Sequence, residues 1–242
     1  MRVRTRPEVQ RLLVRSLPAR FVAGPGVDDA LRVAGELIAT GRRVSVEHAA
    51  ADPADDEAEL AALLGRLHAA GWAADCDVVL TVGRLGTART RALAAAAREA
   101  GVGVVLTGAE SDVGEVAGAS VAVSTREPDA ERRCRALAAG GVRLADGGGT
   151  AGRLAFVRCL NVLLAAPGRP GIATTDPRLI AITGERAAWH DRAPESWEHV
   201  MPYGIRTDEQ QRLVAAGYRV RVAVPSGAGA LGVVARRLGG RA

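Results

Sequence analysis

The chain contains no lysine, so all 32 of its basic residues are arginines. A Schiff base requires a lysine amine, and the phosphate loop GxxxxGK[ST] requires a lysine near its end, so the sequence excludes both chemistries. Abundant alanine, glycine and valine accompany this absence, which together indicate the coding bias of a GC-rich genome. The formal net charge of +5 is therefore weak support for a nucleic-acid partner.

Aromatic residues and cysteines are also scarce. Aromatics make up 3% of the chain, which leaves few rings on which bases could stack, so we expect no nucleic-acid partner. Cys76, Cys134 and Cys159 show no CxxC spacing and are odd in number, and we expect reduced, buried thiols rather than a disulfide framework. The four histidines do not gather at metal-ligand spacing, so we expect no metal site.

No apolar run reaches the length of a membrane span, and we expect a cytoplasmic protein. Residues 1–19 are basic and amphipathic, and we interpret them as an N-terminal lead-in to a single domain at 20–242. Contact of this lead-in with a membrane surface, which would place the protein at the inner face of the membrane, stays open as an alternative. The oligomeric state also stays open.

Apolar stretches alternate with helix-like stretches along the whole chain. Helix-start signals such as Asp176-Pro177 and helix-stop glycines at 41, 71, 101 and 217 separate them. The run 77–82 is continuously apolar after its first residue, which is typical of a parallel strand buried on both faces. The pattern predicts strands near 43–48, 77–82, 102–107, 119–124, 142–145 and 171–175, with two more within 198–224.

Eight strands, nearly all followed by helices, predict one (β/α)8 barrel, and a doubly wound open sheet is the alternative. Too few residues separate the third and fourth strands for a full helix, so we expect a distorted barrel with a shortened helix near 111–118. In such a barrel the site lies at the carboxyl ends of the strands. The candidate residues there are His48, Thr81, Thr107, Ser124, Arg143, Asp146, Thr174, Thr175, Tyr203, Arg236 and Arg237.

Several motifs occur in a familiar order along this pattern. They are RFVAG at 20–24, RRVSVEH at 42–48, VRLADG at 142–147, IATTDPRLI at 172–180, MPYGIR at 201–206, GYRVRVAVPSG at 217–227 and the pair Arg236-Arg237. No single motif is specific, but their order and spacing resemble the proline dehydrogenase family from about residue 20 to residue 237. The resemblance implies an FAD-dependent barrel that oxidises L-proline, or a related imino or amino acid, to pyrroline-5-carboxylate and passes the electrons to a quinone.

The resemblance also implies roles for individual residues. Arg236 and Arg237 match the arginine pair that holds the substrate carboxylate, a task that suits two guanidinium groups. Arg143 matches an arginine that lies against the flavin, and Thr174 matches a threonine that contacts the adenosine-diphosphate side of FAD. Thr175, in place of the family's histidine, is the third residue that we expect at the cofactor.

Several family positions hold different residues here, and most of them have lost a group that would touch the flavin or the proline ring. Asp146 replaces a lysine, Gly149, Ala223 and Val233 replace tyrosines, and Thr81 and Thr107 replace a lysine and an aspartate. Two hypotheses follow from this pattern. The first is a diverged flavoenzyme acting on proline or a related amino acid. The second is a degenerate barrel without flavin redox activity that serves as a binding or regulatory protein.

Overall fold

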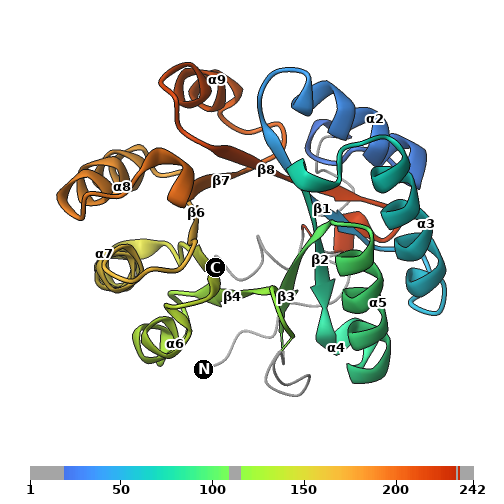
Figure 1. Ribbon diagram of the computed structural model, residues 1–242, viewed down its shortest axis with the longest axis horizontal. Helices are drawn as coiled ribbons and strands as arrows, with labels where there is room; N and C mark the ends of the chain where they lie inside the picture. Colours follow the sequence, from blue (N-terminus) through green and yellow to red (C-terminus); the bar gives the residue numbers. More distant parts are fainter. Residues whose placement is uncertain (1–18, 109–115, 233, 235–242) are drawn as a thin grey trace, which may run out of the picture.

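The structure is a computed structural model that describes residues 19–108, 116–232 and 234. Eight parallel strands close into a barrel in chain order, and β8 pairs with β1 in parallel, from Arg43 opposite Arg221 to His48 opposite Ser226. The helices form an outer ring around the strands (Figure 1). This closure confirms the predicted (β/α)8 barrel and excludes the open sheet.

The strands lie close to the predicted stretches. They are β1 (Arg43–His48), β2 (Cys76–Thr81), β3 (Gly103–Thr107), β4 (Ser120–Ser124), β5 (Gly141–Ala145), β6 (Gly171–Ala173), β7 (Glu198–Pro202) and β8 (Val220–Ser226). β6 is the shortest of these and ends at Ala173, so that Thr174 and Thr175 follow the strand rather than form part of it. Both threonines therefore belong to the loop at the carboxyl end of the barrel.

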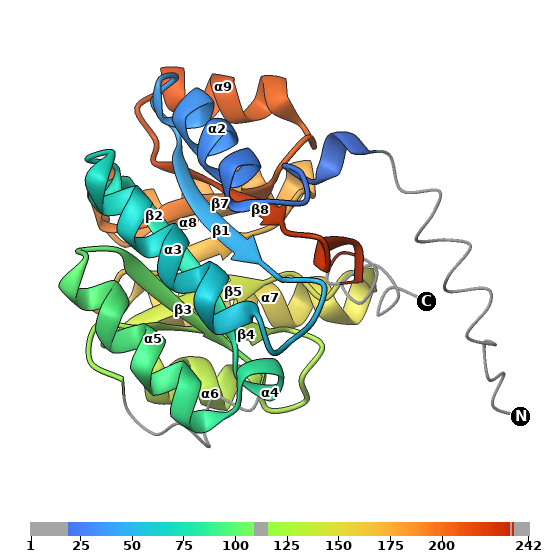
Figure 2. The same ribbon diagram turned by 90° about the vertical axis from the view of Figure 1, so that its right-hand side faces the viewer.

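The helices cover the outside of the barrel. They are α2 (Val27–Ile38), α3 (Asp56–Ala69), α4 (Val82–Leu85), α5 (Thr87–Glu99), α6 (Ala130–Leu137), α7 (Gly149–Leu164), α8 (Pro177–Trp189) and α9 (Thr207–Ala215). Figure 2 shows the barrel from the side, with α2, α3 and α5 packed along the strands. Asp176 starts α8 as predicted, because its side chain accepts a hydrogen bond from the backbone N–H of Arg178 at 2.9 Å and Pro177 follows it.

Residues along each strand alternate between two environments. On β1, Val44 and Val46 pack outward in the apolar layer beneath the helices, whereas Ser45 faces the barrel interior, where it meets a side chain from β5. The outer layer forms one large cluster over β1 to β3 and β8, and a second over β4 to β6. The apolar core thus lies between the strands and the helices. The barrel interior contains polar and charged side chains such as Ser45 and Arg143.

Two expectations fall on segments that the structure describes only in part. Most of the predicted shortened helix near 111–118 lies in residues 109–115, outside the described residues, and 116–119 form a turn before β4. Of the lead-in at 1–19, only Ala19 is described, at the start of the short 3-10 helix η1 (Ala19–Phe21). Among the described residues, no helix combines the length and apolarity needed to cross a bilayer.

Candidate functional site

An open hollow of about 580 Å³ lies beside the carboxyl ends of β5, β6 and β7. It is lined by residues 146–149 and 175–177 together with Arg126 and Arg206. The first turns of α7 and α8 begin here, and unpaired N–H groups at helix starts favour anions. Two arginines and the start of α7 favour a negatively charged group here, whereas the carboxylates of Asp146 and Asp176 in the same lining oppose it.

The glycine run between β5 and α7 shapes one wall of this hollow. Gly148 and Gly149 have positive φ angles of 73° and 67°, and a Cβ on either would meet no atom within 4 Å. Gly147 has a different role, because a Cβ there would come within 2.8 Å of the backbone N of Arg126. The run therefore combines one position of close packing with two open positions where a ligand could approach the backbone.

Thr174 and Thr175 have different surroundings at the edge of this hollow. The hydroxyl of Thr174 donates to Asp146 Oδ2 at 3.3 Å and accepts from the backbone N–H of Asp176 at 3.1 Å, and the residue is buried. Thr175 is half-buried and lines the hollow itself. The structure thus brings both predicted residues to one place, with Thr174 holding the loop and Thr175 facing the space.

Asp146, which stands where the resemblance expects a lysine, has partners within its own loop. Its Oδ1 accepts from the backbone N–H of Gly148 at 2.8 Å, and its Oδ2 accepts from Thr174. The carboxylate therefore joins the end of β5 to the end of β6. It also adds a second negative charge, besides that of Asp176, to a hollow lined by two arginines.

A second hollow, of about 240 Å³, lies at the carboxyl ends of β1, β2 and β3. It collects the predicted candidates His48, Thr81 and Thr107. Arg84 from α4 also lines it, and this guanidinium forms an ion pair with the buried carboxylate of Asp56. The carboxyl end of the barrel thus holds two hollows, one over β1–β3 and one over β5–β7.

His48 is fixed by hydrogen bonds on both sides of its ring. Its Nδ1 lies 2.9 Å from the hydroxyl of Ser226 on β8, and its Nε2 contacts the carboxylate of Glu59 on α3. Ser226 is fully buried, so its hydroxyl cannot act as a nucleophile on a bound substrate. The hydrogen bonds of His48 instead connect β1 to β8 and to α3.

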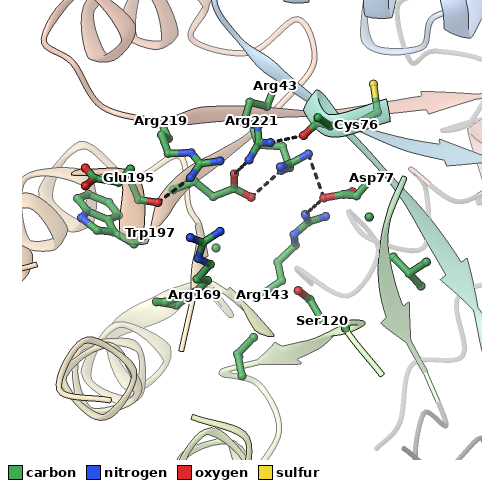
Figure 3. Close-up of a pocket in the computed structure, with 18 of the residues that line it drawn as sticks. Arg43, Cys76, Asp77, Ser120, Arg143, Arg169, Glu195, Trp197, Arg219 and Arg221 are labelled. Atoms are coloured by element: carbon green, nitrogen blue, oxygen red, sulfur yellow. Dashed lines mark hydrogen bonds and ion pairs between the residues drawn. The ribbon is translucent and has the colours of Figure 1, made fainter. Parts of the chain in front are cut away.

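Arg143 lies apart from the two threonines. Its guanidinium donates from Nη1 to Ser45 Oγ at 2.7 Å. It also donates from Nη2 to Asp77 Oδ2 at 2.7 Å (Figure 3). It lines a cavity at the amino ends of the strands, which shares no residue with the hollow over β5–β7. The structure therefore does not bring Arg143 together with Thr174 and Thr175.

The partners of Arg143 belong to an ion-pair network inside the barrel. Arg221 on β8 contacts Asp77 Oδ2 at 3.1 Å and Glu198 Oε1 at 2.5 Å, and it donates to the backbone oxygen of Val44 at 2.9 Å. Arg43 lies 3.4 Å from Asp75 and 3.8 Å from Glu198. The network joins β1, β2, β5, β7 and β8 across the amino end of the barrel.

The network shifts the pKa values of its members. Burial alone would raise the pKa of Asp77, but the charges of Arg143 and Arg221 and the hydroxyl of Ser45 outweigh it and hold that pKa below its usual range. Burial alone would lower the pKa of Arg221, yet Asp77 and Glu198 raise it above its usual value. Burial lowers the pKa of Arg43, and the positive charges of Arg221 and Arg219 lower it further.

The sequence contained a signal for this network that the motif comparison did not use. Asp77, Glu198 and Arg221 are charged residues within otherwise apolar strands, and each lies one position from a buried outward-facing residue. In a closed barrel such positions face the interior.

The predicted substrate-binding pair, Arg236 and Arg237, lies outside the described residues.

Comparison with curated proteins finds partial matches to proline dehydrogenases. The chain is 34% identical to proline dehydrogenase 1 of Bacillus subtilis over 88 residues, which are 36% of this chain and 29% of that protein. It is 43% identical to proline dehydrogenase of Deinococcus radiodurans over 56 residues, which are 23% of this chain and 18% of that protein. These matches span less than a third of each relative. No protein-family model matches the chain.

Comparison with solved structures finds the same fold. Proline utilization A from Bdellovibrio bacteriovorus, inactivated by N-propargylglycine, matches with a TM-score of 0.78 at 16% identity over 90% of this chain and 32% of that chain. The protein from Corynebacterium freiburgense matches with a TM-score of 0.65 at 15% identity over 97% of this chain and 31% of that chain. Part of the chain is thus similar in sequence to proline dehydrogenases, and the whole barrel shares its fold with the solved proline utilization A structures.

Proposed function

We propose that this protein is an FAD-dependent oxidoreductase that converts L-proline, or a related imino or amino acid, to pyrroline-5-carboxylate or the corresponding imine. The electrons would pass to a quinone. The observation that carries this proposal is the match to proline dehydrogenases, which is joined to a closed barrel with open hollows at the carboxyl ends of its strands. The site of a (β/α)8 enzyme lies at that end.

The hollow over β5–β7 fits the diphosphate of FAD. Gly149 leaves room for a ligand beside its backbone, and the start of α7, which no side chain caps, favours negative charge. Arg126 and Arg206 line the same hollow, and arginine side chains bind phosphate oxygens through paired N–H groups. These residues, with Thr175, would hold the adenosine-diphosphate part of the cofactor. When bound, the flavin supplies the acceptor for the hydride that the substrate loses.

The loop beneath that hollow positions these groups. Thr174 links Asp146 to Asp176, so that the ends of β5 and β6 keep one arrangement. The Asp146 carboxylate accepts the N–H of Gly148 and thereby holds the glycine run open. A carboxylate here also repels phosphate, and we therefore expect weaker cofactor binding than a lysine at this position would give.

Further parts of the proposal rest on the family resemblance. Arg236 and Arg237 would bind the substrate carboxylate. The resemblance assigns Arg143 to the flavin. To reach it, the guanidinium would have to give up its hydrogen bonds to Ser45 and Asp77, which compete with cofactor binding. We also propose residues 1–19 as a lead-in and 20–242 as one barrel domain. A quinone in the membrane would be reached from the membrane surface, with the protein otherwise cytoplasmic.

The absorption spectrum of purified protein tests the cofactor directly. We expect a flavin spectrum after expression or after reconstitution with FAD, and anaerobic proline should bleach it. Addition of a soluble quinone should then restore the colour. A protein that stays colourless after reconstitution would contradict the proposal and favour the degenerate barrel with a binding or regulatory role.

Two variants of Asp146 test whether the diphosphate of FAD lies in this hollow, without reference to the substrate. Asp146→Lys restores the positive charge that the resemblance expects, and Asp146→Asn removes the negative charge alone. We expect FAD to bind more tightly to the lysine variant than to the asparagine variant, because phosphate gains a charge partner. If both variants bound FAD no better than the parent protein, the diphosphate would not lie in this hollow.

A further inference from the structure

A separate cavity of about 300 Å³ opens at the amino ends of the strands. Its walls come from residues that precede or begin β2, β3, β4, β6, β7 and β8. None of them lines the hollows at the carboxyl end. The cavity is therefore a second candidate site at the opposite end of the barrel, and Arg143 is its one lining residue to which the proposed oxidation gives a role.

The lining of this cavity carries more positive than negative charge. Five of its side chains are arginines and three are carboxylates, a surplus of two positive charges: Arg43, Arg143, Arg169, Arg219 and Arg221 against Asp77, Glu195 and Glu198. Asp75, just outside the lining, is a partner of Arg43. The inner arginines are the three that form the ion-pair network, and they share Asp75, Asp77 and Glu198.

The two outer arginines have no such partners. In the described part of the chain, no carboxylate lies within 4.0 Å of the guanidinium of Arg169 or of Arg219. Arg219 donates from Nη1 to the backbone oxygen of Glu195 at 2.6 Å, which orients it without neutralising it. Arg169 is held through its backbone, whose N–H donates to Gly140 at 3.3 Å, and Pro170 follows it. Two arginines thus line the cavity without a carboxylate partner among the described residues, and a side-chain hydrogen bond orients Arg219.

The side chains of the cavity converge. Figure 3 shows the guanidinium groups of Arg143, Arg169 and Arg219 turned toward the same hollow, with Trp197 beside them. Burial lowers the pKa of Arg43, and the nearby positive charges of Arg221 and Arg219 lower it further. Positive side chains held close together favour an anion that brings compensating charge.

We propose that this cavity binds a small oxyanion with two negative charges, held between the guanidinium groups of Arg169 and Arg219. A phosphate monoester and a dicarboxylate share this chemistry, because both offer planar or tetrahedral oxygen pairs that match the arginine fork. The cavity volume is that of a small-molecule site. The inner network of Arg43, Arg143 and Arg221 lies at the bottom of the site. Its ion pairs with Asp75, Asp77 and Glu198 stay in place when the anion binds.

Isothermal titration calorimetry on the purified full-length protein tests this proposal. Inorganic phosphate and succinate are titrated separately at constant ionic strength set with sodium chloride, because weak surface contacts are screened by salt. We expect one of the two to bind with a stoichiometry near one. Binding of phosphate alone would assign the site to a phosphate compound, and binding of succinate alone would assign it to a dicarboxylate.

The double variant Arg169→Gln/Arg219→Gln should weaken that binding by at least about tenfold, because it removes two charge-assisted contacts. The matched control is Arg132→Gln/Arg135→Gln, which removes two exposed arginines of α6 that pair with surface carboxylates. Circular dichroism and thermal melting establish that each variant is folded. Arg169→Gln alone provides a second variant, since the side chain of Arg169 makes no hydrogen bond to another described residue.

Two results would overturn the proposal. One is binding of the anion by the double variant with the affinity of the parent protein. The other is a failure of both phosphate and succinate to bind beyond the heat seen with chloride at equal ionic strength. Neither depends on the flavin, so the outcome is independent of the proposed oxidoreductase activity.

Discussion

The two ends of the barrel interior are built from different residues. At the amino end, long charged side chains from five strands meet in one network around Asp77 and Arg221. At the carboxyl end of the same barrel, inward positions hold small residues such as Ala145, Ala173 and Thr81, and the space above them is open. Buried ion pairs thus fill the interior at the amino end, whereas at the carboxyl end the pair of Arg84 and Asp56 lies beside an open hollow.

The difference implies that the ends respond differently to mutation. A buried ion pair contributes little net stability compared with an apolar pair, but removal of one partner leaves the other charge buried without compensation. Substitution of a small uncharged residue beside an open hollow leaves no buried charge without a partner. We therefore expect the amino end to control stability and the carboxyl end to control ligand binding.

The largest expected effect is that of Asp77→Ala. Arg143 and Arg221 would lose their shared carboxylate while staying buried, and their side chains are only 11% and 7% exposed. We expect the free energy of unfolding to fall by about 3–5 kcal/mol. Denaturant-induced unfolding followed by circular dichroism measures this change.

The matched control for that variant is Glu36→Ala, which removes an ion pair with Arg32 on the exposed face of α2. We expect a change of about 0.5 kcal/mol or less, because exposed pairs within one helix contribute little. If Asp77→Ala cost no more than Glu36→Ala, the network would not hold the amino end of the barrel.

A histidine at the amino end makes stability depend on pH. His199 on β7 is buried between Trp197 and Tyr218, at ring distances of 4.7 and 5.7 Å. Burial lowers its pKa from 6.5 to about 4, while Glu209 raises it slightly and Arg212 lowers it. The unfolded chain therefore binds a proton between these values and the folded chain does not. The contribution of His199 to the free energy of unfolding is therefore fully present above pH 6.5, and about 3 kcal/mol of it should be lost as the pH drops to 4.

His199→Phe keeps an aromatic ring at this position and removes the titrating group. Unfolding measured at several pH values should show a shallower loss for this variant than for the parent protein between pH 6.5 and 4. The control is the change of half-buried His190 to phenylalanine, measured over the same pH range. Parallel pH profiles for His199→Phe and the parent protein would exclude this account of the acid sensitivity.

At the carboxyl end, the expected effect is on the cofactor. Arg126→Gln/Arg206→Gln should raise the dissociation constant for FAD about tenfold, because each arginine offers a charge-assisted hydrogen bond to phosphate. Fluorescence titration of the apoprotein measures this constant, and Arg132→Gln/Arg135→Gln again serves as the charge-matched control. An unchanged constant in the Arg126/Arg206 variant would place the diphosphate elsewhere.

The sequence predicted the fold well because the fold depends on local patterns. Apolar runs, helix-start signals and glycines recur with each unit, and every strand lies within about two residues of its predicted position. The short helix α4 was missed, since its four residues follow β2 without a turn signal. The resemblance predicted that Thr174 and Thr175 lie at the cofactor, and in the structure Thr175 lines a hollow while Thr174 is buried beneath it and bonded to Asp146.

The network at the amino end could not be predicted in the same way. Arg143 and Asp77 are 66 residues apart, and their contact depends on barrel closure and on the register of β1 with β2 and of β5 with its neighbours. A motif assigns Arg143 to the flavin, whereas the geometry gives it two partners inside the barrel. Side-chain direction in the interior is a property of the closed sheet, and no single motif contains it.

The smallest expected effect separates the two threonines of the β6 loop. Thr174→Val removes a buried hydroxyl that bonds to Asp146 and to the backbone of Asp176, and leaves the latter N–H without its partner. We expect a loss of about 1 kcal/mol in the free energy of unfolding. Thr175→Val changes a half-buried residue at the hollow, so its stability should be nearly that of the parent protein while its affinity for FAD falls. Thermal melting and FAD titration of both variants distinguish these roles, and the reverse pattern would assign Thr174 to the ligand and Thr175 to the loop.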